Sequence, residues 1–372
     1  MKFTIAKSGF VAGLQRIQSV VQTRSTMPIL SNVRIQAKDK KIQLFATDLE
    51  LGIQDSIPAE IAVEGAMTVS ARKLFEISKE LKEETIRLES EEDLGIVIRS
   101  GKSKFKLRGL SAEEFPYFPE IKERARLTLP AAFLQEMIRK SAFSVSNDLT
   151  RVALNGVLLH MPGSKSNLIV MVGTDGHRLS LVSRDIPGKK GDEKEIKVII
   201  PRKTLQELKK YLDEGSRESI ELVLSQNHVL FRDGEYTLLS RLIDGKFPSY
   251  DEVIPKENPS RLSLNRDAFQ GAVRRVSILS DEKTHAVKLN LKKDELLISS
   301  SNPEMGEASE TLAVGYSDEA LELAFNVRYI QDVASALQGE EMHLLFFDPL
   351  SPVRIEDPGD PGFIGVIMPM RL

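Results

Sequence analysis

The sequence predicts an α+β protein of three repeated domains, each with two helices packed on antiparallel sheets. One pattern of strand, helix and strands recurs at intervals of about 125 residues, far above the usual period of a solenoid repeat. Each copy contains two helix-sized stretches against about eight strand-sized ones, so we expect both helices on one face of the sheets. The 372 residues, 41% of them hydrophobic, are enough for three separate cores.

Three markers occur in the same order in every copy. The first is a short strand that follows a basic residue, the second is an arginine at the start of a helix, and the third is a small turn after a strand. They stand at residues 3–5, 127–129 and 262–264, at Arg72, Arg202 and Arg328, and at residues 46–48, 173–175 and 300–302. Markers that keep one order indicate an internal repeat.

Within the first copy, the elements follow from the spacing of apolar residues. Apolar residues at every third or fourth position predict helices, and alternation of apolar and polar residues predicts strands. In chain order we expect a strand at 3–5, a helix at 8–21, strands at 29–36, 41–46, 51–58 and 67–70, a helix at 72–81, and strands at 85–88, 95–99 and 104–107. Each copy therefore consists of two halves, each a helix followed by strands.

Two proline-bearing segments connect the copies. Residues 115–119 and 247–250 contain prolines, which favour extended backbone in the residue before them. Extended connectors at these places predict three domains, at residues 1–125, 126–255 and 256–372.

Composition excludes several classes of site. The chain has no cysteine, which excludes disulfides, thiolate catalysis and cysteine-based zinc sites. No apolar run approaches the roughly 20 residues of a membrane helix, and the first residues run into a strand without a leader. We therefore expect a cytoplasmic protein with no membrane partner.

Charge is divided unevenly between the expected helices and the rest of the chain. The formal net charge is only −3, but the helical stretches carry more Lys and Arg than Asp and Glu, and the remaining residues carry an excess of acids. A basic helix side would attract a phosphate backbone without reading its sequence. The alternative is that these are ordinary solvated charges, which helices tolerate well.

Several motifs, distributed along the whole chain, resemble those of one known protein family. They stand at residues 1–4, 28–30, 46–50, 174–179, 201–203, 244–248 and 368–372, and the last of them is the most specific. Through these motifs the chain resembles the bacterial DNA polymerase III beta subunit family, the sliding clamps. The resemblance implies the DNA clamp fold, with two subunits closing head to tail into a ring whose helices line the central hole.

The resemblance also implies a function without chemistry. The family encircles double-stranded DNA non-specifically as a processivity factor, and it tethers the DNA polymerase III alpha subunit, the clamp loader and other proteins with clamp-binding motifs. We therefore expect no catalysis, no cofactor and no metal. The chain has no nucleotide-binding motif, so an ATP-driven loader would be a separate protein.

Contacts with the DNA backbone are implied for basic residues on the helices. The alternative for each is a solvated charge at a helix end. The residues are Arg24, Arg72, Lys73, Arg139, Lys140, Arg202, Lys203, Arg274 and Arg275.

The family holds partner peptides in a shallow apolar groove between its second and third domains. Branched aliphatic and Met side chains can mould around an anchor residue of the partner, while polar groups orient it. The matching residues here are Leu154, Thr174, Gly176, His177, Arg178, Leu179, Pro248, Val253, Asn326, Tyr329, Val366, Ile367, Met368, Pro369, Met370, Arg371 and Leu372.

The groove departs from the family pattern at a few positions. Thr284 and His285 stand where better-known members have an aromatic residue followed by arginine, and Glu252 replaces a basic residue. Leu350 and Pro352 lie in a loop that is usually smaller or more polar. We therefore expect the groove to exist with an altered peptide preference.

The contact between subunits is likewise implied by the resemblance. Lys73, Leu81 and Phe105 of the first domain would meet Ile278 and Leu279 of the third. A contact between two different surfaces must close into a ring or else propagate as a filament.

Two rival functions remain open. An enzyme would use Asp175 and His177 as acid and base or as metal ligands, but none of the five histidines belongs to an HxH or HExxH pattern. Asp48 holds the same place in the first copy, as expected of a turn residue that accepts backbone hydrogen bonds. A monomeric peptide-binding scaffold would keep the groove but leave the basic helices unexplained.

Overall fold

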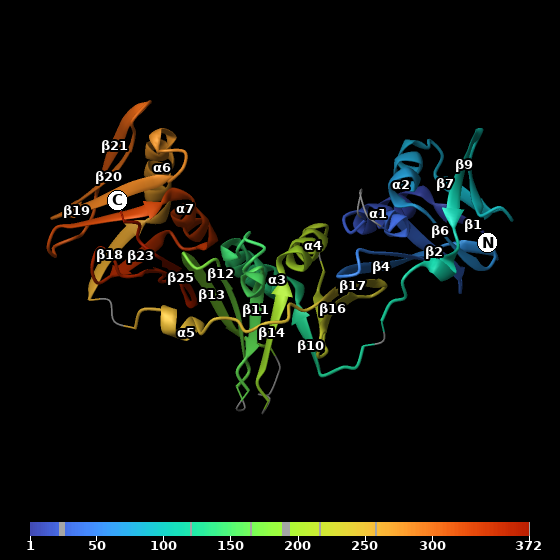
Figure 1. Cartoon of the computed structure of the whole chain (residues 1–372), viewed down its shortest axis with the longest axis horizontal. Helices are drawn as coiled ribbons and strands as arrows, with labels where there is room; N and C mark the ends of the chain where they lie inside the picture. The colour runs from blue at the N-terminus through green and yellow to red at the C-terminus, as the bar shows by residue number, and fades with distance from the viewer. Residues whose placement is uncertain are drawn as a thin grey trace. The chain divides into compact units, whose positions relative to one another are not determined.

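The computed structural model describes residues 1–21, 27–119, 121–163, 166–187, 194–215, 217–256 and 259–371. The chain forms two compact units (Figure 1), residues 1–132 with 203–242 and residues 133–202 with 243–372. The first copy of the repeat lies in the first unit and the third copy in the second. The central copy is divided between them.

Every copy repeats one order: a strand, a helix, four strands, a second helix and three strands. The first copy consists of β1 (Lys2–Ala6), α1 (Lys7–Gln18), β2 (Asn32–Lys38), β3 (Lys41–Thr47), β4 (Leu51–Pro58), β6 (Gly65–Ser70), α2 (Ala71–Glu80), β7 (Thr85–Ser90), β8 (Gly95–Ser100) and β9 (Ser103–Leu110), with β5 (Glu60–Val63) added. The central copy consists of β10 (Ala125–Pro130), α3 (Ala131–Ser141), β11 (Gly156–Met161), β12 (Leu168–Thr174), β13 (Arg178–Asp185), β14 (Ile196–Pro201), α4 (Arg202–Asp213), β15 (Ser219–Leu224), β16 (His228–Asp233) and β17 (Tyr236–Arg241).

The third copy follows a short connecting helix, α5 (Tyr250–Val253). It consists of β18 (Ser260–Asn265), α6 (Arg266–Val276), β19 (Ala286–Lys292), β20 (Glu295–Asn302), β21 (Gly306–Ala313), β22 (Leu321–Asn326), α7 (Val327–Ala336), β23 (Glu341–Phe346), β24 (Val353–Asp357) and β25 (Asp360–Ile367). The threefold repeat predicted from the sequence is therefore confirmed.

Three local predictions need correction. Residues 28–31 form a single 3₁₀ turn, so β2 begins at Asn32 rather than at residue 29. Proline at the first position of this turn has its backbone angle preset for a helical start. Helix α1 ends at Gln18, and the short strand β5 pairs with β1, although no strand was predicted there.

Polar side chains cap two of the three helices of the second marker, α2 and α7. Ser70 accepts a hydrogen bond from the backbone N–H of Lys73, and Asn326 accepts one from Arg328 at 3.0 Å. Such caps satisfy backbone N–H groups that have no partner within the helix. The basic residues at these starts therefore stand on a fixed first turn.

The turn of the third marker has the same hydrogen bonds in all three copies. One side-chain oxygen accepts two backbone N–H groups two and three residues later, which is the geometry of an Asx turn. The pairs are Asp48 with Glu50 and Leu51, Asp175 with His177 and Arg178, and Asn302 with Glu304 and Met305, at 2.7–3.2 Å. The interpretation of Asp175 as a turn residue is thus confirmed.

All strand pairings in the described residues are antiparallel. The first unit holds one thirteen-stranded sheet, in which α1 packs on α2, β3 and β4. The second unit holds an eight-stranded and a four-stranded sheet, and α6 packs on α7 and on β20. Fully buried side chains such as Leu14, Ile17, Phe269 and Val333 fix these helices. Each contributes roughly 1.5–3 kcal/mol by leaving water.

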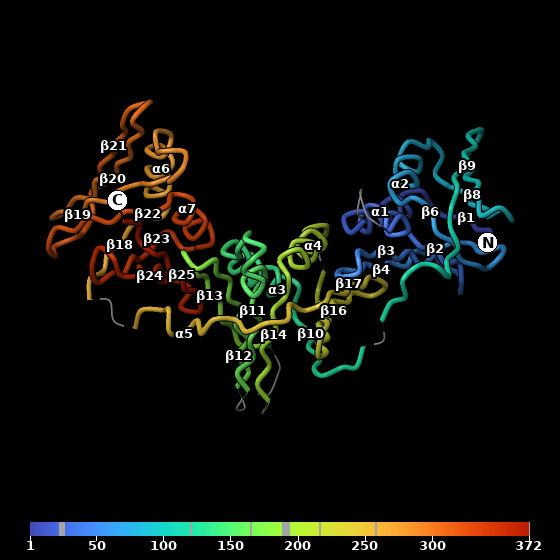
Figure 2. Tube along the Cα trace, in the orientation of Figure 1, coloured from blue at the N-terminus to red at the C-terminus, as the bar shows by residue number. Residues whose placement is uncertain are grey.

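Neighbouring copies are joined by strand pairing. In the first unit β17 pairs with β4, and in the second unit β25 pairs with β13, which Figure 2 shows side by side. By position in the repeat, β17 and β25 are equivalent, as are β4 and β13. The same connection is therefore used twice.

Candidate functional site

An apolar cavity of about 110 Å³ lies in the second unit, where β25 joins β13. Most of the predicted groove residues line it. Its lining is Leu154, Thr174, Gly176, His177, Arg178, Leu179, Phe247, Pro248, Tyr250, Val253, Val366 and Met368. Phe247 and Tyr250 were missed, although they belong to the proline-bearing connector that the sequence marks.

Backbone hydrogen bonds hold the end of the chain beside this cavity. Leu179 of β13 stands opposite Val366 of β25, and the Met368 N–H donates to the His177 carbonyl at 2.8 Å. The Met370 N–H donates to Ala324 at 2.7 Å. The two methionines are thus placed by tertiary contacts.

The wall of the cavity includes a buried tyrosine. Tyr250 Oη lies 2.8 Å from His160 Nδ1, and His160 Nε2 lies 2.9 Å from Glu195. Burial, reinforced by Asp251 and Glu195, raises the pKa of Tyr250 to about 12. The phenol therefore keeps its proton and can donate a hydrogen bond at neutral pH.

A second, polar cavity of about 410 Å³ adjoins the first and shares His177 and Arg178 with it. Asn326 and Tyr329 line this one, with Val145, Ser146, Asn147, Asp148, Arg151, Asp175, Arg328 and Asp332. The two cavities offer an apolar half and a polar half of one groove.

Arg178 connects the two halves. Its Nε lies 3.1 Å from Asp175 Oδ2, its Nη2 donates to the Phe143 carbonyl at 2.8 Å, and its guanidinium stands 4.6 Å from the centroid of the Tyr329 ring. Burial, with Asp175 adding to it and Arg178 opposing it, raises the pKa of Tyr329. Arg178 therefore orders the groove wall.

The last residues of the chain only partly match their prediction. Ile367 is fully buried and lines neither cavity, so the structure does not place it in the groove with its neighbour Val366. Pro369 and Met370 are half-buried and Arg371 is exposed, and none of these lines either cavity. Leu372 lies outside the described residues.

The positions that depart from the family pattern do not line either cavity in the described residues. Glu252 and Leu350 are exposed, and Pro352 is half-buried. Thr284 donates its hydroxyl to Asp281 at 3.1 Å, and His285 has a left-handed backbone with φ 50°.

The basic residues at the helix starts are mostly exposed, and most of them carry a partner. Arg72 and Lys73 each lie 2.8 Å from Glu76, and these two hydrogen bonds lower the pKa of that exposed carboxyl. Lys203 pairs with Asp48, and Arg202 donates to Asn147. The pairs of Arg72 and Lys73 with Glu76 are exposed on both sides and therefore weak enough to exchange for a phosphate, whereas the Asp48 partner of Lys203 is only 7% exposed.

The basic residues on α6 lie at its end. Arg274 and Arg275 are exposed, and Arg275 pairs with Glu310 at 2.6 Å. The predicted contact at Arg24 lies outside the described residues.

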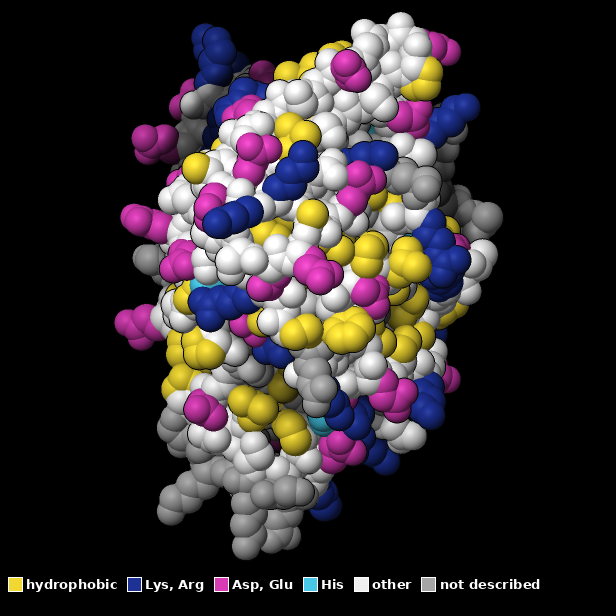
Figure 3. Space-filling model, turned by 90° about the vertical axis from the view of Figure 1, so that its left-hand side faces the viewer, with side chains coloured by type: hydrophobic (Ala, Val, Ile, Leu, Met, Phe, Trp, Pro, Cys, Tyr) yellow, Lys and Arg dark blue, Asp and Glu magenta, His cyan; other side chains and the backbone are white. Residues whose placement is uncertain are grey.

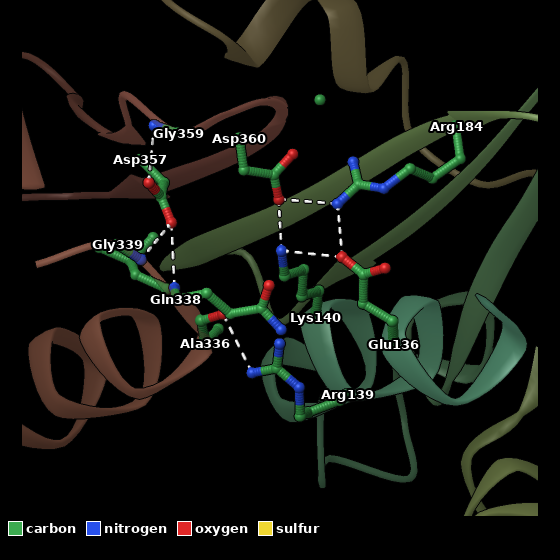
Figure 4. Close-up of polar contacts among 12 residues, drawn as sticks. Glu136, Arg139, Lys140, Arg184, Ala336, Gln338, Gly339, Asp357, Gly359 and Asp360 are labelled. Carbon is green, nitrogen blue, oxygen red and sulfur yellow. Dashed lines mark hydrogen bonds and ion pairs between the residues drawn. The ribbon is translucent and has the colours of Figure 1, made fainter. Parts of the chain in front are cut away.

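The prediction of a DNA contact at Lys140 is wrong in this structure. Its side chain is only 1% exposed, and its ammonium is paired with Glu136 and Asp360 (Figure 4). The neighbouring Arg139 is half-buried and donates to the Ala336 carbonyl at 3.0 Å, at the end of α7. Both residues serve the junction between the central and third copies.

The residues of the predicted subunit contact differ in exposure. Leu81 is 4% exposed, so little of its side chain is available to a partner. Phe105 and Ile278 are 40% and 76% exposed, Lys73 is exposed, and Leu279 is half-buried.

The enzyme hypothesis gains no support from the site. Both carboxylate oxygens of Asp175 are taken by its own turn and by Arg178. Within the described ranges, no three His, Asp or Glu residues are grouped to hold a metal ion. No helix in the same ranges is long and apolar enough to cross a membrane.

Comparisons with known proteins agree along the whole chain. Three family models match, namely the N-terminal, central and C-terminal domains of the DNA polymerase III beta subunit, at residues 1–119, 128–249 and 251–371. The beta sliding clamp of Caulobacter vibrioides is 37% identical over 376 residues and covers 100% of both chains.

Solved structures show the same fold. A sliding clamp from Bartonella birtlesii bound to griselimycin is 36% identical with a TM-score of 0.96, and one from Pseudomonas aeruginosa bound to griselimycin is 33% identical with a TM-score of 0.94. Each match covers 100% of both chains. With three repeated domains of antiparallel sheets and helices and an apolar groove beside its C-terminal strand, the chain belongs to the DNA polymerase III beta subunit family, the beta sliding clamps.

Proposed function

We propose that two copies of this chain close head to tail around double-stranded DNA and act as the processivity factor of the replicative polymerase. The groove holds peptide segments of the DNA polymerase III alpha subunit, the clamp loader and other partners. The chain itself is non-catalytic, works in the cytoplasm, and needs no cofactor or metal. Its three domains are residues 1–125, 126–255 and 256–372.

The observation that carries the proposal is the repeated strand connection. The last strand of one copy pairs with the third strand after the first helix of the copy before it: β17 pairs with β4, and β25 pairs with β13. The remaining equivalents are β9, the last strand of the first copy, and β21, the third strand after the first helix of the third copy. In the described residues, β21 pairs only with β20, and residues 103–108 of β9 pair only with β8. A second copy placed head to tail would make the missing connection between β21 and β9.

Charge and exposure on the two edges support this pairing. Strand β9 carries Lys104, Lys106 and Arg108, while β21 carries Glu307 and Glu310. Opposite charges across an antiparallel pair are favourable. Figure 3 shows that exposed hydrophobic side chains lie among charges on this end of the C-terminal domain. Strand edges with unpaired backbone N–H and C=O groups normally require a pairing partner or other protection.

Non-specific DNA binding rests on the exposed basic residues of the helices. Arg72, Lys73, Lys203, Arg274 and Arg275 are exposed, and Arg202 is half-exposed. Contacts to phosphates carry no sequence information, which permits sliding. Arg24 belongs to the proposal from sequence alone.

Topological retention tests the proposal. The chain is loaded by its cognate loader onto nicked circular DNA, the circles are then linearised, and the solution mass is measured in the same buffer. We expect a dimer that stays on circles and leaves from cut ends. Retention that is unchanged by cutting, or a monomer that never loads, would favour the alternative of a monomeric peptide-binding scaffold.

A further inference from the structure

Four charged side chains meet at the junction between the central and C-terminal domains (Figure 4). Glu136 and Lys140 come from α3, Arg184 from β13, and Asp360 from the first residue of β25. Lys140 Nζ lies 3.0 Å from Glu136 Oε1 and also bonds Asp360. Arg184 Nη2 lies 2.6 Å from Glu136 Oε1 and 2.7 Å from Asp360 Oδ2. These four residues form a charge cluster in which acids and bases alternate.

The charge cluster is largely removed from water. The side chains of Lys140, Asp360 and Arg184 are 1%, 15% and 19% exposed. Burial alone would raise the pKa of Asp360, but the hydrogen bonds from Lys140 and Arg184 outweigh it and hold that pKa below its usual range. A buried charge is costly once its partner is removed. Each member therefore depends on its two partners of opposite charge.

The charge cluster and the groove lie at opposite ends of one strand pair. Strand β25 starts at Asp360 and pairs with β13 from Phe363, opposite Val182, to Ile367, opposite Arg178, where it ends beside the groove. At Gly362 a Cβ atom would lie 2.4 Å from the Ser183 carbonyl oxygen, so this close approach of the two strands depends on glycine. Strand β25 therefore leads from Asp360 in the charge cluster to Met368 in the cavity lining.

We propose that the charge cluster is a positioning device that holds β25 against β13 and so keeps the groove open to the width that a partner peptide needs. The inference rests on the proposed role of the groove as a peptide site. Lys140, Glu136 and Arg184 line neither cavity, so they act through β25 and do not touch the peptide. Replacing Lys140 by Met leaves two carboxylates sharing Arg184, and the excess negative charge loosens the junction.

The test measures griselimycin binding to the full-length chain by calorimetry, with the Lys140→Met variant beside the wild type. If Lys140→Met leaves about one tenth of the molecules binding-competent, the dissociation constant rises roughly tenfold. The charge-matched variant Lys140→Met/Asp360→Asn keeps the Arg184–Glu136 pair and should regain most of the affinity. Hydrogen exchange should be faster in β25 of Lys140→Met alone.

A matched control is Lys209→Met, which also removes a lysine from a central-domain helix. Lys209 is half-exposed and pairs with Asp213 at 2.7 Å, and such surface pairs contribute little. Its affinity should equal that of the wild type. If Lys140→Met does not fold, Asp360→Asn decides the question, because it preserves shape while removing one charge, and a weakening of about threefold is expected.

Different outcomes separate the two proposals. An unchanged dissociation constant in Lys140→Met, or a double variant as weak as the single one, would overturn the positioning role. Val253→Asp, at a 41% exposed position of the groove lining, tests the groove itself. If Val253→Asp leaves griselimycin binding unchanged, the groove proposal fails. If Val253→Asp abolishes binding while Lys140→Met has no effect, only the positioning role fails.

Discussion

Arg178 and Asp332 form an ion pair of 2.5 Å that joins the first residue of β13 to helix α7 of the next domain. Together with Arg184 and Asp360 at 2.7 Å, it gives β13 an ionic contact to the C-terminal domain near each of its ends. The groove lies at the Arg178 end. The two ion pairs therefore bracket the strand junction on which the groove is built.

Arg178→Met should destabilise the chain by about 3 kcal/mol, because it leaves the carboxylate of Asp175, which is 15% exposed, without its cation. Urea unfolding of the purified chain measures the change. The control is Arg151→Met, in the same cavity but 51% exposed, which should cost less than about 1 kcal/mol. Equal losses of unfolding free energy in the two variants would contradict the argument that the buried carboxylate of Asp175 needs its cation.

Gly176→Ala should cost about 1–2 kcal/mol, because Gly176 has φ +88°, a backbone region that disfavours side chains. Its Cβ would also lie 2.9 Å from Arg151 Nη1, so the tip of the Arg151 side chain at the groove must shift. Thermal unfolding measures the loss of stability, and griselimycin binding measures the change at the groove. Gly315→Ala is the control: nothing lies within 4 Å of its Cβ, and it should stay within about 0.5 kcal/mol of the wild type.

Ile278→Asp should convert the dimer into a monomer of 41.5 kDa while leaving subunit stability within about 0.5 kcal/mol, because Ile278 is 76% exposed. Light scattering over a concentration series gives the mass. Leu149→Asp, at an 83% exposed position of the central domain, should remain dimeric. A dimer that survives Ile278→Asp would exclude this residue from the subunit contact.

Arg72→Ala/Lys73→Ala should weaken binding to a short duplex and make it less dependent on salt. Each lost phosphate contact lowers the slope of log K against log salt by about 0.9. Anisotropy titrations at several salt concentrations provide that slope. Lys292→Ala/Lys293→Ala, at exposed positions of the β19–β20 hairpin, removes the same charge and should leave the slope unchanged. Equal effects of both pairs would show that only net charge matters.

Stability should fall in acid as the charge cluster is protonated. Burial opposes the charged forms of Asp360 and Glu136, but hydrogen bonds from Lys140 and Arg184 hold both pKa values below their ordinary values of 3.8 and 4.5. A carboxyl whose pKa is lowered by folding stabilises fully above its unfolded pKa and loses that contribution as pH falls through its folded pKa. The decline should therefore begin below about pH 4.5. Urea unfolding across this range should show a shallower decline of the unfolding free energy for Asp360→Asn than for the wild type. An identical decline would exclude Asp360 as a source of the pH dependence.

Local patterns predicted the fold well because they act over short distances. The arginine at a helix start and the Asp or Asn turn recur in all three copies, and each is made by bonds within a few residues. Strand β5 and the 3₁₀ turn at residues 28–31 were missed. In β5 only one residue is even partly shielded from water, so its strand character comes from pairing with β1 rather than from its own pattern.

The groove was predicted as a set of residues, but its geometry was not. Phe247 and Tyr250 were assigned only to a connector, and Tyr250 becomes part of the wall through its contact with His160, 90 residues earlier. Ile367 carries the same apolar signal as Val366, and only the direction of β25 decides which of them faces the cavity.

By itself, the sequence determined the threefold repeat, its turns and its helix starts, because periodicity and capping are properties of neighbouring residues. The tertiary structure alone decided which charges remain free for a partner. As a lysine, Lys140 would be expected at the surface, yet it is buried against Asp360, 220 residues away. Lys73, by contrast, stays exposed beside Glu76. Burial depends on which distant residue folds over a charge, and no local pattern contains that information.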